Sequence, residues 1–269
     1  MRGWIQSYQL VATAIFVLAS AVVSGRLLLL ARRTRERPER LLGLGILGTA
    51  VLGYGVLIAA LILRGDSGIV TSDPLVRSLA AAGNIIHDLG VSMIVLFVLT
   101  VFRTSERWAR GLAGLLLLAL WGGHLGWELS NGYRSSAPGD GFWWLRYSVI
   151  WIYPLWTMIE SYRFYGLMRR RRAFGLADPL VTNRFFLWGS AALGTALATW
   201  TASIPYLLIG RAEAAAAWTP VIQVATATVG IVTVTLYALT FFAPAWYRSW
   251  VTGAAAGPVG DEAAESGRG

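Results

Sequence analysis

The sequence predicts an all-α integral membrane protein, a single bundle of seven transmembrane helices. Of its 269 residues 56% are hydrophobic and only 14% are charged, whereas soluble domains average about 25% charged residues. Apolar stretches of membrane-spanning length cover most of the chain. Arginines gather in alternate connections between these stretches, which is the pattern of helices that cross a membrane back and forth.

Each apolar stretch reaches the roughly 20 residues that a helix needs to cross the hydrocarbon. In chain order the predicted helices are 7–31, 39–63, 76–102, 108–129, 142–167, 180–209 and 218–245. They form one transmembrane domain, 1–250, and the residues 251–269, rich in Gly, Ala and acids, are predicted to be a disordered cytoplasmic tail. The first stretch has no basic flank before it and no obvious cleavage site, so we expect no cleavable signal peptide.

Prolines and glycines indicate where the predicted helices begin, bend and pack closely. A capping residue followed by proline predicts a helix start at Asp73, Asp178 and Thr219. Pro154 lies inside a predicted helix, where proline produces a kink. Small residues let helix backbones approach closely in lipid. In the second helix they are Gly43, Gly45, Gly48 and Gly53.

The arginines also predict the orientation, because short loops rich in positive charge stay in the cytoplasm. One set of connections and the C-terminal segment hold sixteen arginines and the other set holds five, so we expect the N-terminus outside and the C-terminus in the cytoplasm. The sixteen are Arg32, Arg33, Arg35, Arg37, Arg40, Arg103, Arg107, Arg110, Arg163, Arg169, Arg170, Arg171, Arg172, Arg184, Arg248 and Arg268. We expect a multi-pass protein of the plasma or inner membrane whose cytoplasmic face attracts anionic lipid and does not bind nucleic acid.

Two residue types are missing. The chain has no cysteine, which excludes disulfides and thiolate ligands, and all 23 basic residues are arginine. The predicted layout resembles that of microbial rhodopsins and of G-protein-coupled receptors. However, the absence of lysine excludes a retinal Schiff base. The third helix ends in Thr100-Val101-Phe102-Arg103 instead of Asp-Arg-Tyr, and the seventh has no Asn-Pro-x-x-Tyr. The layout by itself carries no function.

Ionisable residues inside the predicted helices are few, and their cost in hydrocarbon marks them as candidates for a site. On helix 76–102, Asn84, His87 and Asp88 lie within about one turn. On helix 108–129, His124 and Glu128 are one turn apart. His87 comes 18 residues before Ser105 in the connecting turn and His124 comes 19 residues after it, so both lie at one depth in the outer half.

We therefore expect His87, Asp88, His124 and Glu128 to converge on one site, with Asn84 and with Arg146 at the start of the next helix as further ligand-binding candidates. This group could recognise a ligand or sense pH through histidine protonation. Alternatively, His87 and His124 could hold a b-type haem or a divalent metal. The residues could also serve only as hydrogen-bonding partners between helices, in which case we expect Arg146 to neutralise Glu128.

These observations predict a sensor or ligand-binding subunit that signals through a cytoplasmic protein partner. The exposed run Arg169, Arg170, Arg171 and Arg172 is the predicted docking surface. Two alternatives stay open, a membrane oxidoreductase or metal-dependent enzyme that uses the two histidines, and a transporter. Whether the chain is an enzyme, and whether it forms oligomers, is left open by the sequence.

Overall fold

The computed structural model describes residues 2–64, 73–131, 141–207 and 212–253, and all regular structure in these ranges is helical. The helices are α1 (Arg2–Thr34), α2 (Arg37–Ile46), η1 (Leu47–Gly53), α3 (Tyr54–Arg64), α4 (Pro74–Phe102), α5 (Arg107–Asn131), α6 (Gly141–Ala173), α7 (Pro179–Leu207), α8 (Ala212–Phe242) and α9 (Ala245–Gly253). The segments α2, η1 and α3 follow one another without a break and form one long helix, whose middle segment η1 is a π-helix.

Two of the predicted helix starts have the expected caps. Asp73 accepts a hydrogen bond from the backbone N–H of Leu75, and Asp178 accepts one from that of Leu180. The predicted start at Thr219 is wrong, because α8 begins at Ala212 and contains Pro220. The residues before it are mostly alanine, which has the highest helix propensity and extends the helix past the proline.

Five helices in the described ranges are long and apolar enough to cross a membrane, which indicates a multi-pass membrane protein. They are Ser7–Thr34, Arg37–Leu63, Pro74–Phe102, Arg107–Ser130 and Trp218–Phe242. Many of their leucines face outward; Leu118 of α5, for example, is 72% exposed. Such side chains are suited to contact with lipid tails, and not with water.

Contacts between six long helices of the described residues form a closed ring. Around it, α1 packs against α2, α2 against α4, α4 against α6, α6 against α7, α7 against α8, and α8 back against α1. Helix α5 lies outside this ring, against α4 and α6. The candidate site residues lie on three helices: Asn84, His87 and Asp88 on α4, His124 and Glu128 on α5, and Arg146 on α6.

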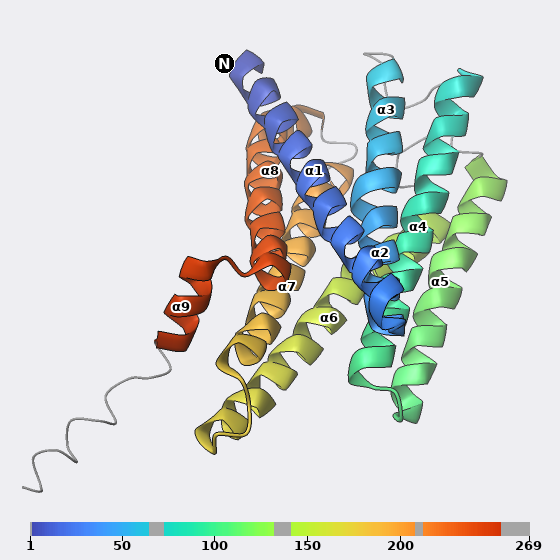
Figure 1. Cartoon of the computed structure of the whole chain (residues 1–269). Helices are drawn as coiled ribbons and strands as arrows, with labels where there is room; N and C mark the ends of the chain where they lie inside the picture. The colour runs from blue at the N-terminus through green and yellow to red at the C-terminus, as the bar shows by residue number, and fades with distance from the viewer. Residues whose placement is uncertain (1, 65–72, 132–140, 208–211, 254–269) are drawn as a thin grey trace, which may run out of the picture.

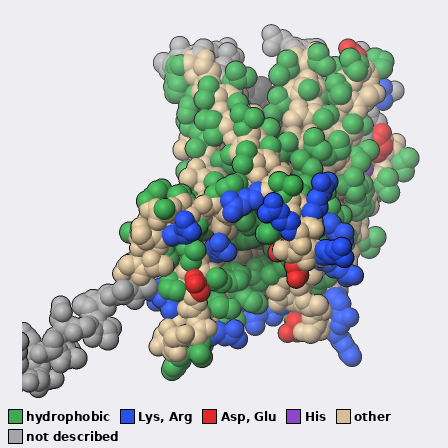
Figure 2. Space-filling view, in the orientation of Figure 1, with side chains coloured by type: hydrophobic (Ala, Val, Ile, Leu, Met, Phe, Trp, Pro, Cys, Tyr) green, Lys and Arg blue, Asp and Glu red, His purple; other side chains and the backbone are tan. Residues whose placement is uncertain are grey.

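The two ends of the bundle differ in charge. The turns between α4 and α5 and between α6 and α7 lie at the end opposite the N-terminus (Figure 1). Figure 2 shows arginine side chains gathered over that half of the molecule, while hydrophobic side chains cover the other half of this face. The last turn of α6 contributes Arg170, Arg171 and Arg172, and the chain then turns at Gly175, whose φ is +71°.

Glycines bring the second helix and α4 into backbone contact. A Cβ atom on Gly90 of α4 would lie 2.5 Å from the backbone N of Thr49, and one on Gly48 would lie 2.8 Å from Cα of Gly90. A Cβ on Gly53 would lie 2.8 Å from Cα of His87. The small residues of the second helix therefore pack against α4 in this bundle and place the π-helix η1 beside His87.

Candidate functional site

A buried ion pair between α4 and α6 is the centre of the candidate site. Nε of Arg146 lies 2.6 Å from Oδ2 of Asp88, and its Nη2 lies 2.7 Å from Oδ1, so the guanidinium donates two hydrogen bonds to one carboxylate. Asp88 is fully buried and Arg146 is 2% exposed. A buried charge needs such a partner, because an unpaired one would cost several kcal/mol.

Both histidines of the chain take part in this cluster. Nδ1 of His124 on α5 donates to Oδ2 of Asp88 at 2.8 Å, and Nδ1 of His87 lies 3.2 Å from Oδ1. Asn84, one turn before Asp88, accepts a hydrogen bond from Nη2 of Arg146 at 3.0 Å. The carboxylate thus receives four hydrogen bonds, which is all that its two oxygens ordinarily accept. We call Asn84, His87, Asp88, His124 and Arg146 the Asp88 cluster.

Glu128 does not belong to the Asp88 cluster. The acidic partner of Arg146 in the structure is Asp88, so the expected pairing of Arg146 with Glu128 is wrong. Oε2 of Glu128 is buried and makes no hydrogen bond within the described part of the chain. The sequence placed both acids at a suitable depth, but which of them faces α6 depends on the rotation of each helix about its axis.

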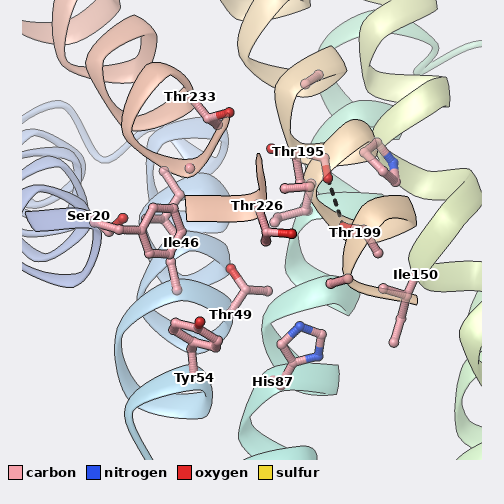
Figure 3. Close-up of a pocket in the computed structure, with 18 of the residues that line it drawn as sticks. Ser20, Ile46, Thr49, Tyr54, His87, Ile150, Thr195, Thr199, Thr226 and Thr233 are labelled. Carbon is pink, nitrogen blue, oxygen red and sulfur yellow. Dashed lines mark hydrogen bonds between the residues drawn. The ribbon is translucent and has the colours of Figure 1, made fainter. Parts of the chain in front are cut away.

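The Asp88 cluster adjoins a cavity of about 420 Å³ in the middle of the ring. Asn84, His87 and Arg146 form part of its wall, while Asp88 and His124 lie behind them. The other walls come from α1, the second helix, α7 and α8, and Figure 3 shows ten labelled residues around this space, with His87 among them. A volume of this size is in the range of small-molecule sites.

Hydroxyl groups and aromatic rings dominate the lining of this cavity. The hydroxyl residues include Thr13, Ser20, Thr49, Thr157, Thr195, Thr199, Ser203, Thr226 and Thr233. The aromatic residues are Phe16, Tyr54, Tyr147, Tyr153, Trp188 and Tyr237. Most of the hydroxyls donate to the backbone of their own helix, as Thr199 does to the carbonyl of Thr195 at 2.8 Å (Figure 3). The lining is therefore largely apolar in character, with polar groups at fixed points.

Three residues of the lining each carry a buried polar atom that has no hydrogen-bond partner in the described part of the chain. These atoms are Nε1 of Trp188 and the hydroxyl oxygens of Thr226 and Thr233. Thr226 and Thr233 lie on the α8 wall of the cavity (Figure 3), and Trp188 lies on α7. An unpaired buried polar group costs about 1–3 kcal/mol, so native proteins contain few of them.

The donor atoms of the Asp88 cluster are directed at one another. Within the described residues, no group of three or more His, Cys, Asp or Glu side chains is arranged to hold a metal ion. His87 and His124, the predicted haem or metal ligands, both turn Nδ1 toward Asp88.

A second ion pair links α4 and α6 near the arginine-rich end. Nε of Arg103, just after α4, lies 2.7 Å from Oε1 of Glu160, which is 2% exposed. Arg163 lies 3.6 Å from the other oxygen of Glu160. The two ion pairs have opposite polarity: Asp88 of α4 is the acid of the first, and Arg103, just after α4, is the base of the second. Asp88 and Arg103 are 15 residues apart in the chain. Arg146 and Glu160 are 14 residues apart along α6.

Comparison with protein-family models, with curated protein sequences and with solved structures gives no match for this chain. Its function is therefore inferred from its own residues and their geometry.

Proposed function

We propose that this chain is a seven-span sensor or ligand-binding subunit of the plasma or inner membrane, with its N-terminus outside. In this proposal a small molecule binds in the central cavity and the signal passes to a cytoplasmic protein partner. The single observation that carries it is the cavity of about 420 Å³, which has the Asp88 cluster in its wall.

The length of the two remaining long helices supports seven spans. Helix α6 has 33 residues and α7 has 29, which correspond to about 50 and 44 Å at 1.5 Å per residue. Both exceed the roughly 30 Å of the hydrocarbon. Some of their polar side chains are paired inside the bundle, as Arg146 is with Asp88 and Tyr162 is with Ser190.

Helix α6 offers a route from the cavity to the arginine-rich end. It carries Arg146 in the cavity wall, Pro154 at mid-length, Glu160 in the second ion pair, and the proposed docking surface Arg169–Arg172 at its end. A proline inside a helix removes one backbone hydrogen bond and allows the helix to bend there. A ligand that shifts the first half of α6 would therefore move its second half relative to α4.

Filling the cavity tests the proposal. Gly230 on α8 lines the cavity and has open space where a Cβ would stand, so Gly230→Leu adds a side chain into the cavity without a clash at Cβ. Gly114 on α5 also has open space, but α5 contributes nothing to the described lining, so Gly114→Leu is the matched control. Binding of the fluorescent probe 1-aminoanthracene is measured in lipid nanodiscs against empty nanodiscs.

We expect the native chain and Gly114→Leu to bind the probe, and Gly230→Leu to lose at least tenfold in affinity. The movement of α6 relative to α4 is measured as the distance between spin labels at Thr104→Cys and Ala173→Cys. The two labels attach only there, because the natural chain has no cysteine. The distance between them should change on probe binding in the native background and not in Gly230→Leu. Equal binding by all three proteins would overturn the proposal. Accumulation of the probe inside proteoliposomes would favour a transporter instead.

A further inference from the structure

His87 gives the wall of the cavity a hydrogen-bonding atom that a ligand can reach. Its ring points from α4 into the space between the helices (Figure 3), and 20% of its side chain is exposed. Nδ1 lies 3.2 Å from Oδ1 of Asp88, whereas Nε2 makes no hydrogen bond within the described part of the chain. Nε2 is also not enclosed by protein, in contrast to Nε1 of Trp188. It is therefore available to a molecule in the cavity.

The contact with Asp88 determines which kind of hydrogen bond Nε2 can make. Asp88 is paired with Arg146, so it is a carboxylate and has no proton to donate. The proton between Asp88 and His87 therefore belongs to Nδ1 of the imidazole. In an uncharged imidazole the second nitrogen then carries a lone pair, so Nε2 accepts a hydrogen bond and donates none. The carboxylate behind the ring polarises the imidazole and strengthens Nε2 as an acceptor.

This acceptor has a fixed position. The hydrogen bond to Asp88 orients the ring, and a Cβ on Gly53 would lie 2.8 Å from Cα of His87, so the backbone there is held closely against η1. The two other members of the Asp88 cluster in the wall are engaged with each other, since Asn84 accepts a hydrogen bond from Arg146. A fixed acceptor binds a complementary donor without the cost of ordering a side chain.

The rest of the lining favours an uncharged ligand. Among the described lining residues Arg146 is the one permanently charged side chain, and its charge is balanced by Asp88. An anion would therefore compete with a buried carboxylate that already occupies the guanidinium. None of the described residues places a carboxylate in the lining, so a cation has no counter-charge there.

Resting on the proposed function, we propose that the cavity binds an uncharged, largely apolar molecule that carries a hydroxyl group, an alcohol or a phenol. The hydroxyl donates a hydrogen bond to Nε2 of His87, and the apolar part of the molecule contacts the aromatic and aliphatic side chains of the lining. Asp88 acts behind His87 as a positioning residue and does not touch the ligand.

Three probes of similar shape test for this hydrogen bond. Fluorenol, fluorenone and fluorene share the same three rings; fluorenol carries a hydroxyl donor, fluorenone only a carbonyl acceptor, and fluorene neither. Each is used to displace 1-aminoanthracene in nanodiscs. The affinities are corrected for partition into empty nanodiscs and for the affinity of 1-aminoanthracene in each protein. We expect the native chain to prefer fluorenol over both other probes by about two- to tenfold, which corresponds to one net hydrogen bond.

Variants of His87 locate the acceptor. His87→Asn keeps an amide N–H that can donate to Asp88 but removes Nε2, so the preference for fluorenol should fall toward one. His87→Gln has a longer side chain whose amide oxygen can accept a hydrogen bond, so it should restore part of the preference. Ser92→Ala removes a buried hydroxyl of the same helix that does not line the cavity, and should keep the full preference. If His87→Asn fails to fold, His87→Leu carries the same test.

The outcomes are distinct. Equal affinity for the three probes in the native chain, with 1-aminoanthracene binding that Gly230→Leu still weakens, would overturn this inference and leave the proposed function standing, since water then binds Nε2. A preference for fluorenone equal to that for fluorenol would also overturn the inference, because the cavity would then supply a donor. A full preference for fluorenol in His87→Asn would do the same. Failure of the native chain to bind 1-aminoanthracene would overturn the proposed function itself.

Discussion

Arg146 of α6 and Asp88 of α4 form a two-point ion pair, at 2.6 and 2.7 Å, that is buried at the edge of the central cavity. Its two helices are not neighbours in sequence, because α5 comes between them in the chain. The pair therefore holds the ring together at the point where the cavity wall carries a charge.

Asp88→Asn should strongly destabilise the protein, because it leaves the buried guanidinium of Arg146 without its counter-charge. Breaking a buried pair at one partner costs about 3–5 kcal/mol in free energy of unfolding. Asp178→Asn is the control, since Asp178 is an exposed helix cap and asparagine caps equally well. The measurement is unfolding in mixed detergent and SDS.

The double variant Asp88→Leu with Arg146→Met should be more stable than the sum of the two single losses implies, because no lone charge remains. Additive losses would mean that the two side chains act independently, contrary to their geometry.

Gly90→Ala should lower the free energy of unfolding by about 1–3 kcal/mol, the usual cost of overpacking. Its new methyl group would meet backbone atoms of Thr49 and Gly48, which cannot rotate away. Gly55→Ala on α3 meets nothing within 4 Å and should be neutral or gain up to about 1 kcal/mol from helix propensity. The same unfolding assay compares them, and equal effects would contradict the close helix contact.

Glu160→Gln should loosen the arginine-rich ends of α4 and α6. The amide keeps the shape of the side chain but loses the charge that holds Arg103 at 2.7 Å. We expect a longer or broader distance distribution between spin labels at Thr104→Cys and Ala173→Cys. Glu106→Gln is the control, because Glu106 is half exposed and lies 3.9 Å from the same arginine. An unchanged distribution in Glu160→Gln would show that other contacts hold these ends.

Alkaline pH should release α9 from α7. The phenol oxygen of Tyr247 accepts a hydrogen bond from Asn183, and burial raises the pKa of Tyr247 above its ordinary value of 10.0. Tyr247 therefore keeps its phenol proton up to a higher pH when α9 is docked on α7 than when α9 is free. The stabilisation of the docked state by this group is complete below about pH 10 and is lost as the pH rises through the higher pKa of the docked state. A spin label at Ser249→Cys should become mobile in that range, and Tyr247→Phe should show no such step.

Much of the helical layout follows from local rules. Runs of apolar residues and the caps at Asp73 and Asp178 depend only on residues that are close together in the sequence, so they can be predicted from it. The same rule failed at Thr219, where an alanine-rich segment outweighed a cap followed by proline. The π-helix η1 has no local signature in the sequence, because it arises where Gly48 and Gly53 meet α4.

The Asp88 cluster was predicted in part, because helix periodicity and depth place Asn84, His87, Asp88 and His124 at one level. The choice between Asp88 and Glu128 as partner of Arg146 needs the rotation of three helices. That rotation is set by tight contacts such as Gly123, where a Cβ would lie 2.6 Å from the backbone N of Arg146. The cavity has no sequence signature, since five of the six helices around it contribute small or hydroxyl residues that are typical of ordinary helix packing.

The contact between α1 and α8 has a consequence for biosynthesis. The first and last long helices close the ring, so one wall of the cavity is missing until α8 has left the ribosome. Until then the inward side of α1, including Thr13 and Ser20, has no partner from the end of the chain and faces lipid or the translocation machinery. A chain that stops after α7 can therefore insert its helices, but it cannot enclose a ligand.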